Sequence, residues 1–302
     1  MARAVRKPVV ACRMPSRFAL CTSVTIALLA FPASALAADV VVPSSVARST
    51  AVPSGGSKTL TLRCPAEAVA LNAAVTNHDP GVTVRRSIPG SGAGTWRFRL
   101  TGTDGGGGVR AVLRCVRLRL PAGVGGARLD VSTRRPPVAV PAGGRTTVRL
   151  RCGRAWVGTG YGFDPGTRGD TRLASVVPRA HGWDFTLQND AASAATARVS
   201  ARCLRQTVTS SRGARLRFGV ARPRFSDAVG PPPGSAGTFT HRCGNSQFSV
   251  ATGYAVDVAD GVNLRLTHPE GRRAGRFRFR GAASDDAVNT FLVCLSRRSS
   301  FG

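Results

Sequence analysis

Leu60-Thr61-Leu62-Arg63-Cys64 opens a pattern that occurs three times in this chain of 302 residues. Its counterparts are Val148-Arg149-Leu150-Arg151-Cys152 and Phe239-Thr240-His241-Arg242-Cys243. In the first two stretches apolar side chains alternate with polar ones, which is typical of a strand with one buried face. A second cysteine follows the first after 51 residues in every copy, and these partners are Cys115, Cys203 and Cys294. The chain therefore contains three copies of one cysteine-framed β unit.

Other features recur in step with the cysteines. A short aromatic strand occurs at Trp96–Leu100, Trp183–Leu187 and Gly275–Phe279. Segments rich in Gly, Pro and Asp separate the alternating stretches, and no stretch shows the 3.6-residue period of a helix. We expect an all-β fold of three tandem small β-sandwich domains, each with about seven strands and a core of its own. Their predicted bounds are 38–126 (repeat 1), 127–214 (repeat 2) and 215–302 (repeat 3).

Residues 1–37 have the features of a signal peptide. Residues 1–17 include five basic residues and no acidic one, an apolar run covers 18–31, and an Ala-x-Ala motif ends at Ala37. The apolar run is shorter than the ~20 residues that a membrane-spanning helix needs. We therefore expect cleavage near Ala37 and a mature chain without a membrane span. Such a chain would be secreted, and either extracellular or associated with the cell envelope.

Export makes disulfides chemically possible. Cleavage removes Cys12 and Cys21 and leaves six cysteines, two in each repeat. The repeat then selects one pairing, in which each domain closes a loop worth roughly 4 kcal/mol in the chain-entropy model. The predicted pairs are Cys64–Cys115, Cys152–Cys203 and Cys243–Cys294. There is no Cys-x-x-Cys pair or Cys/His cluster, so we expect neither a metal site nor a cofactor.

Two resemblances add to this interpretation. The cysteine spacing and the strand number are similar to those of an immunoglobulin domain. In that family the tryptophan follows the first cysteine closely, whereas Trp96 and Trp183 lie nearer the second. The order of the strands is therefore left open.

The chain also resembles modules of exported bacterial proteins, actinobacterial ones in particular. These modules begin Cys-Pro-Ala-Gly, continue through Leu-Gly-Gly-Gly and end with Trp-x-Val, Asn and Cys. The matching residues are Cys64-Pro65-Ala66 in repeat 1 and Val157–Gly162, Trp183, Asn189 and Cys203 in repeat 2. Repeat 1 has Asn72 and Ala73-Ala74 in place of the glycines, and repeat 3 lacks the tryptophan. The resemblance implies a small secreted β-module and brings no catalytic residues with it.

The chain is strongly basic, with a formal net charge of +28. Without the five basic residues of the signal peptide the charge is +23, and it is spread over the three repeats as +7, +9 and +7. A GC-rich genome would explain the preference for Arg over Lys, but it would not explain the shortage of acids. Arg forks bind phosphate and carboxylate in a bidentate manner. We expect anion-binding candidates on the strand faces opposite the aromatic residues, namely Arg97, Arg99, Arg276, Arg278 and Arg280. Repeat 2 departs from this pattern with Asp184 and Thr186, and the alternative is a merely solvated arginine face.

The sequence contains no constellation of catalytic residues. There is no Gly-x-Ser-x-Gly elbow and no repeated acid pair for glycoside cleavage. We expect a non-enzymatic envelope or surface protein, structural or adhesive, that binds anionic envelope polymers or a surface protein. The alternatives are a secreted hydrolase of envelope polysaccharide, with its site between repeats, and a module that binds a protein partner. A dedicated nucleic-acid role is not expected, because the aromatic residues are assigned to the cores.

Overall fold

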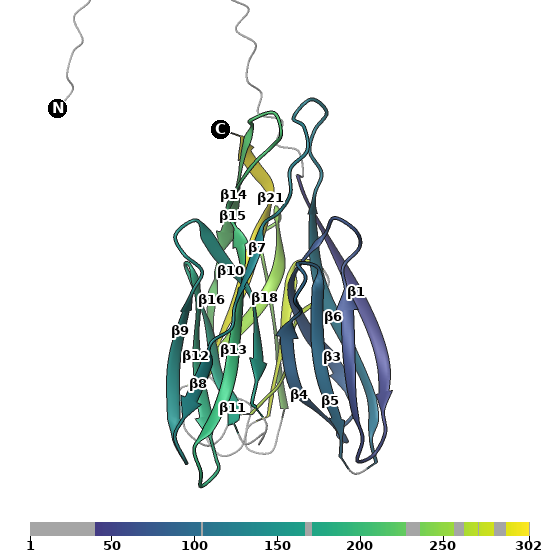
Figure 1. The fold of residues 1–302 in the computed structure, drawn as a ribbon, viewed down its shortest axis with the longest axis vertical. Helices are drawn as coiled ribbons and strands as arrows, with labels where there is room; N and C mark the ends of the chain where they lie inside the picture. Colours follow the sequence, from purple (N-terminus) through teal and green to yellow (C-terminus); the bar gives the residue numbers. More distant parts are fainter. Residues whose placement is uncertain are drawn as a thin grey trace, which may run out of the picture. The chain divides into compact units, whose positions relative to one another are not determined.

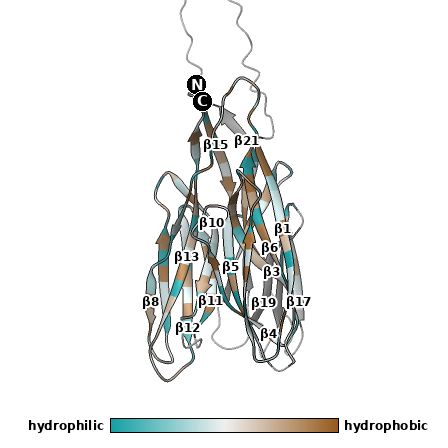
Figure 2. Ribbon diagram, turned by 45° about the vertical axis from the view of Figure 1, so that its right-hand side comes forward, coloured by the Kyte–Doolittle hydropathy of each residue, from teal (hydrophilic) through white to brown (hydrophobic). Residues whose placement is uncertain are grey.

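Antiparallel strands make up the fold of the computed structural model. The structure describes residues 40–103, 105–166, 171–227, 236–256, 263–270, 272–280 and 288–301. These ranges contain no helix, which confirms the predicted all-β class, and hydrophobic and hydrophilic residues alternate along the strands (Figure 2). Among the described residues, no helix is long and apolar enough to cross a membrane. The predicted signal peptide lies outside the described residues.

Repeat 1 contains six strands in two sheets. One sheet has the order β1-β6-β3 and the other has the order β2-β5-β4. The strands from β1 to β6 gather together in Figure 1, coloured from purple to teal. Their bounds are β1 (Val41–Val52), β2 (Ser57–Arg63), β3 (Val69–His78), β4 (Val82–Pro89), β5 (Thr95–Gly102) and β6 (Gly107–Leu118).

Repeat 2 has the same order, with its first strand broken in two. β7 and β8 both pair with β13, which pairs in turn with β10, and the second sheet has the order β9-β12-β11. Pro136 lies at the break, where a residue without an N–H cannot extend the ladder. The bounds are β7 (Val131–Arg134), β8 (Pro137–Val140), β9 (Arg145–Arg151), β10 (Trp156–Asp164), β11 (Thr171–Arg179), β12 (Gly182–Asn189) and β13 (Ala195–Arg205).

Repeat 3 follows the same plan. Its first strand is divided at Pro223 into β15 and β16, which both pair with β21, and β21 pairs with β18. The second sheet has the order β17-β20-β19. A short strand at the end of repeat 2, β14 (Thr207–Thr209), pairs with β15. The bounds are β15 (Arg215–Ala221), β16 (Arg224–Asp227), β17 (Ala236–Arg242), β18 (Gln247–Val256), β19 (Asn263–Glu270), β20 (Ala274–Arg280) and β21 (Val288–Phe301).

Each repeat is closed by one disulfide between its two sheets. The bonds join Cys64 to Cys115, Cys152 to Cys203 and Cys243 to Cys294, the same pairs that the repeat predicts. The order β2-β5-β4 matches the B-E-D part of an immunoglobulin sheet, and β6-β3 matches F-C. β1 occupies the place beside β6 where an immunoglobulin domain has its strand G. Three disulfides of this kind are typical of an oxidising, extracellular-type environment.

A β-bulge lies opposite the second cysteine in every repeat. The extra residue is Leu71 in β3, Thr159 in β10 and Val250 in β18, and all three are fully buried. The apolar side chains beyond Cys115 change parity, which predicts a bulge or a sheet change in β6. The structure instead keeps β6 in continuous register with β1 and places the bulge on the neighbouring β3.

Ala35–Gly302 form one compact unit, in which sheets continue from one repeat to the next. β4 of repeat 1 pairs with β10 of repeat 2, and β11 of repeat 2 pairs with β18 of repeat 3. β19 of repeat 3 lies beside β3 of repeat 1, without a ladder between them among the described residues. The fourth strand of each repeat thus lies beside the third strand of the next, which closes a pseudo-threefold ring. β3, β10 and β18 lie beside one another at its centre.

Small residues at one strand position allow this docking. The matching residues are Ala74, Gly162 and Gly253. A Cβ atom on Gly162 would lie 2.4 Å from the Ser87 carbonyl oxygen, and one on Gly253 would lie 2.6 Å from that of Val176. The two junctions with a glycine form ladders, and the junction at Ala74 does not. We attribute this difference to the Cβ atom of Ala74.

The buried hydrophobic residues form two clusters, and one of them extends across the contacts between repeats. One cluster belongs to repeat 1 and contains Trp96, Phe98 and Leu113. The other joins the cores of repeats 2 and 3 and includes Leu71 and Val116 of repeat 1. Val116 therefore turns to the opposite face of β6 from Leu113 because the neighbouring repeats cover that face. This burial explains the change in parity.

Candidate functional site

The structure places the predicted arginines of repeat 1 on an open strand face. Arg97 and Arg99 lie on β5 and are exposed, whereas their neighbours Trp96 and Phe98 are buried. Arg276 is exposed on β20 of repeat 3. The side chains of the other two predicted arginines, Arg278 and Arg280, lie outside the described residues.

The corresponding face of repeat 2 is occupied by an ion-pair network. Asp184 is only 8% exposed and accepts hydrogen bonds from Arg149 at 2.7 Å and Arg179 at 2.6 Å. Burial alone would raise the pKa of this carboxyl, but the two guanidinium groups outweigh burial and lower it. Arg149 and Arg179 are therefore already paired with the carboxylate of Asp184.

The pairing of β4 with β10 joins the strand face that carries Arg97 and Arg99 to repeat 2. Arg86, in register with Arg99, forms an ion pair with Asp164 of repeat 2 at 2.8 Å. Burial lowers the pKa of Arg135, and the positive charges of Arg86, Arg198 and Arg97 lower it further against the opposing charge of Asp164. We call these four arginines, with Arg99, the basic face. It spans β4, β5, β13 and the break between β7 and β8.

A buried cation lies at one end of this face. Arg202 on β13 is 2% exposed, and Cys203 beside it points into the core of repeat 2. Its guanidinium lies 6.0 Å from the centre of the Trp96 ring, and Nη2 donates to the Thr95 carbonyl oxygen at 3.3 Å. Its Nε has no hydrogen-bond partner, and no acid among the described residues forms an ion pair with it.

Repulsion and burial both act on this side chain. Burial lowers the pKa of Arg202 from its usual 12.5 to about 10, and the positive charge of Arg135 contributes in the same direction. A fall of that size corresponds to roughly 3 kcal/mol of unfavourable free energy for the charged form at neutral pH. The charge therefore lacks the anion that would normally compensate it.

Arg202 and Arg135 line a groove of about 400 Å³. Its other walls are the loop after β4, with Gly90, Ser91 and Ala93, and the strand β7, with Val131 and Thr133. Because Val131, Thr133 and Arg135 alternate along the chain, they all face this groove, and Thr133 is paired with Arg202 across the ladder. Arg135 also donates a hydrogen bond to the Pro89 carbonyl oxygen. We call this site the arginine groove.

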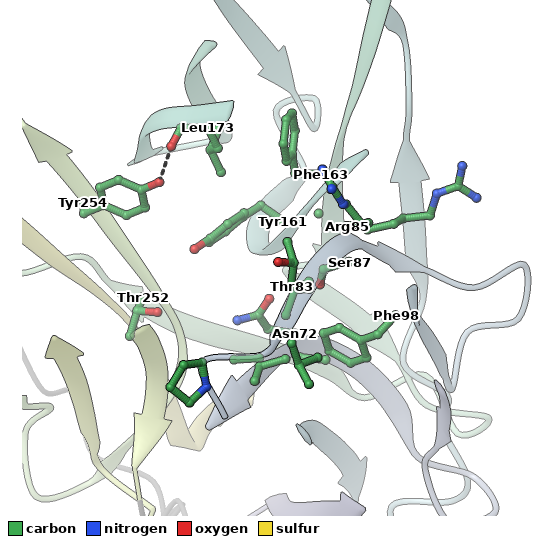
Figure 3. A pocket seen from close by; sticks show the side chains of 18 residues that line it. Asn72, Thr83, Arg85, Ser87, Phe98, Tyr161, Phe163, Leu173, Thr252 and Tyr254 are labelled. Atoms are coloured by element: carbon green, nitrogen blue, oxygen red, sulfur yellow. Dashed lines mark hydrogen bonds between the residues drawn. The ribbon is translucent and has the colours of Figure 1, made fainter. Parts of the chain in front are cut away.

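The arginine groove was missed by sequence reasoning, which singled out only Arg97 and Arg99 of the neighbouring face. A second hollow, of about 430 Å³, lies where β3, β4, β10, β11 and β18 of all three repeats meet, and Figure 3 shows its lining. No group of three or more His, Cys, Asp or Glu that could hold a metal ion occurs within the described ranges. Comparison with known proteins adds no family: no family model matches the chain, and no curated protein is significantly similar to it.

Proposed function

We propose that this chain is an exported, non-enzymatic protein of the cell envelope or surface that binds an anionic polymer through the basic face and the arginine groove. The observation that carries the proposal is Arg202, a buried guanidinium with an unpaired Nε beside a second arginine. A phosphate or carboxylate of the polymer would supply the missing negative charge and accept the free N–H.

The two parts of the surface would act differently. Arg202 is already desolvated, so one anionic group that reaches it from the arginine groove gains strong charge-assisted hydrogen bonds. The basic face is exposed, so its arginines add weaker and salt-screened attraction to neighbouring charges along the same polymer. A polymer with regularly spaced phosphates or uronic acids would contact both parts at once.

The sequence supports export of this kind of protein. The predicted signal peptide, the three disulfides and the resemblance to secreted bacterial modules all agree with a site outside the cytoplasm. An oxidising compartment at the bacterial surface contains phosphorylated and uronic-acid polymers, which are the partners that the arginine groove fits.

The test is cosedimentation of the oxidised mature protein with envelope fragments over a salt series. We expect binding that falls steeply as salt rises, because the exposed part of the surface is screened. Arg97→Gln/Arg99→Gln should weaken binding, whereas Arg48→Gln/Arg117→Gln, with the same loss of charge on the other sheet of repeat 1, should not. Equal effects of the two double variants would mean that net charge alone drives binding. Soluble sugar products would instead favour a hydrolase.

A further inference from the structure

The hollow at the centre of the ring has a structural origin in repeat 1. Tyr161 and Phe163 of repeat 2 and Thr252 and Tyr254 of repeat 3 line it, and their counterparts in repeat 1 are Ala73 and Val75. Two repeats therefore fill the centre with large or hydroxylated side chains, and the third leaves space. The result is a central pocket of about 430 Å³, within the size range of sites for small ligands.

Neutral hydrogen-bonding groups point into this central pocket. Asn72 is 3% exposed, and its Oδ1 has no hydrogen-bond partner. Ser87 accepts a hydrogen bond from Trp96 Nε1 at 3.1 Å, which leaves its own O–H available to donate. Tyr161 shares a hydrogen bond with Thr252. Figure 3 shows these side chains, with Thr83, around one space.

Much of the remaining described wall is apolar. Phe98, Phe163 and Leu173 cover its sides, and Tyr254 turns its hydroxyl away to the Leu173 carbonyl oxygen at 2.7 Å. Among the residues whose side chains the structure describes, two charged ones line it: Arg85 is exposed, and Arg86 is paired with Asp164. A charged ligand would therefore gain little here, and a purely apolar one would leave Asn72 Oδ1 without a donor.

We propose that the central pocket binds a neutral sugar, one or two rings in size. A sugar offers hydroxyl groups that both donate to Asn72 Oδ1 and accept from Ser87, and its C–H face can lie against the aromatic wall. This site is distinct from the arginine groove, and the proposal does not depend on anion binding.

The test is saturation-transfer NMR of the oxidised mature protein with single neutral sugars. The probes are glucose, galactose, mannose, arabinose and N-acetylglucosamine, with cyclohexanol as an apolar ring that carries only one hydroxyl. We expect at least one sugar to bind with a dissociation constant of roughly 1 mM, and binding should be insensitive to salt. Salt insensitivity separates this result from that of the anion experiment.

Three variants locate the site. Ala73→Phe places a ring in the pocket, at the position that Tyr161 holds in repeat 2, and should abolish the signal. Ala139→Phe, at an exposed position of β8, should leave it unchanged. Asn72→Ala, which adds no volume, should weaken binding about tenfold through the loss of one buried hydrogen bond. Circular dichroism establishes that each variant is folded.

Several results would overturn the proposal. Absence of saturation transfer from the wild-type protein to any of the five sugars would do so. An undiminished sugar signal in both Ala73→Phe and Asn72→Ala would also do so, because the sugar would then bind elsewhere. Binding of cyclohexanol as tight as that of the best sugar, and unaffected by Asn72→Ala, would show a merely apolar pocket.

Discussion

Replacement of Arg202 by Met should stabilise the protein when no anion is present. Methionine keeps the length and apolar volume of the arginine stem and removes the charge. The charged guanidinium costs roughly 3 kcal/mol, from a pKa that falls to about 10. Loss of the hydrogen bond to Thr95 and of the contact with Trp96 offsets about 2 kcal/mol of that gain. The net expectation is a stabilisation of about 1 kcal/mol.

An anion should reverse this order. If the wild-type protein binds short-chain polyphosphate in the arginine groove, a concentration of 100 times its dissociation constant adds about 2.7 kcal/mol to the free energy of unfolding. Arg202→Met lacks the buried cation, so the same polyphosphate should stabilise it by much less. The wild-type protein should then be the more stable of the two.

Urea unfolding, followed by tryptophan fluorescence in a phosphate-free buffer of low ionic strength, measures both quantities. Urea is used because guanidinium is itself a salt and would screen the site. Arg48→Met, at an exposed position of β1, is the matched control and should change stability by no more than about 0.5 kcal/mol. If Arg202→Met lowers the free energy of unfolding by about 2 kcal/mol or more without anion, the reasoning is refuted, because the guanidinium would then be satisfied within the fold.

Three further predictions concern pH, docking and the disulfides. The pKa of Arg202 is lower in the folded protein than in the unfolded chain, so above about pH 10 the unfolded chain binds more protons. The stability of the wild-type protein should therefore rise with pH relative to that of Arg202→Met. A constant difference in stability between about pH 9 and 11 would contradict this. Gly160→Ala should destabilise the protein by about 3 kcal/mol or more in urea unfolding, because the new Cβ atom would lie 2.0 Å from the Leu71 carbonyl oxygen of repeat 1. The control is Gly126→Ala, which should be nearly neutral because a Cβ atom there has no atom beyond its chain neighbours within 4 Å. Cys243→Ser/Cys294→Ser should lower the free energy of unfolding by about 4 kcal/mol, and a loss below about 1 kcal/mol would show that closing this loop contributes little.

The sequence predicts the features that depend on local pattern. Alternation along Trp96–Leu100 fixes which side chains are buried, and the equal spacing of the cysteines fixes their pairing. Both follow from geometry within one repeat: a strand alternates its faces, and three copies of one fold share one disulfide. The all-β class was therefore predictable without knowledge of how the repeats meet.

The ring and the arginine groove depend on contacts between repeats, which no local pattern specifies. By alternation with Cys203, Arg202 belongs to the outer face of β13, and a single sandwich would leave it in solvent. Repeat 1 covers that face and buries it. One partial signal was present: Val116 and Leu204, each next to the second cysteine, are apolar side chains on the face opposite it, and an apolar outer face must be covered.

The departures from threefold symmetry distinguish the junction of repeats 1 and 2 from the other two junctions. The residue before the second cysteine is Arg114, Arg202 or Val293 in the three repeats, and Arg114 donates to Ser45 at 2.5 Å. In repeat 3 the valine removes the cation, and in repeat 2 Asp184 neutralises the face that Arg97 keeps basic in repeat 1. The junction of repeats 1 and 2 therefore combines a buried arginine with a basic face whose one ion pair among the described residues is Arg86–Asp164.

The same junction also connects the two proposed sites. Arg86 lines the central pocket, and its charge acts on Arg135 at the arginine groove. A polymer in which neutral sugars alternate with phosphates or uronic acids could place a ring in one site and an anion in the other. Linkage of two weak sites raises their combined affinity well above that of either one, provided that the polymer spans the distance between them. On this reasoning, a glycan fragment that carries both groups should bind more tightly than the neutral sugar or the free anion, and the Arg202→Met variant should lose that advantage while it retains the neutral sugar.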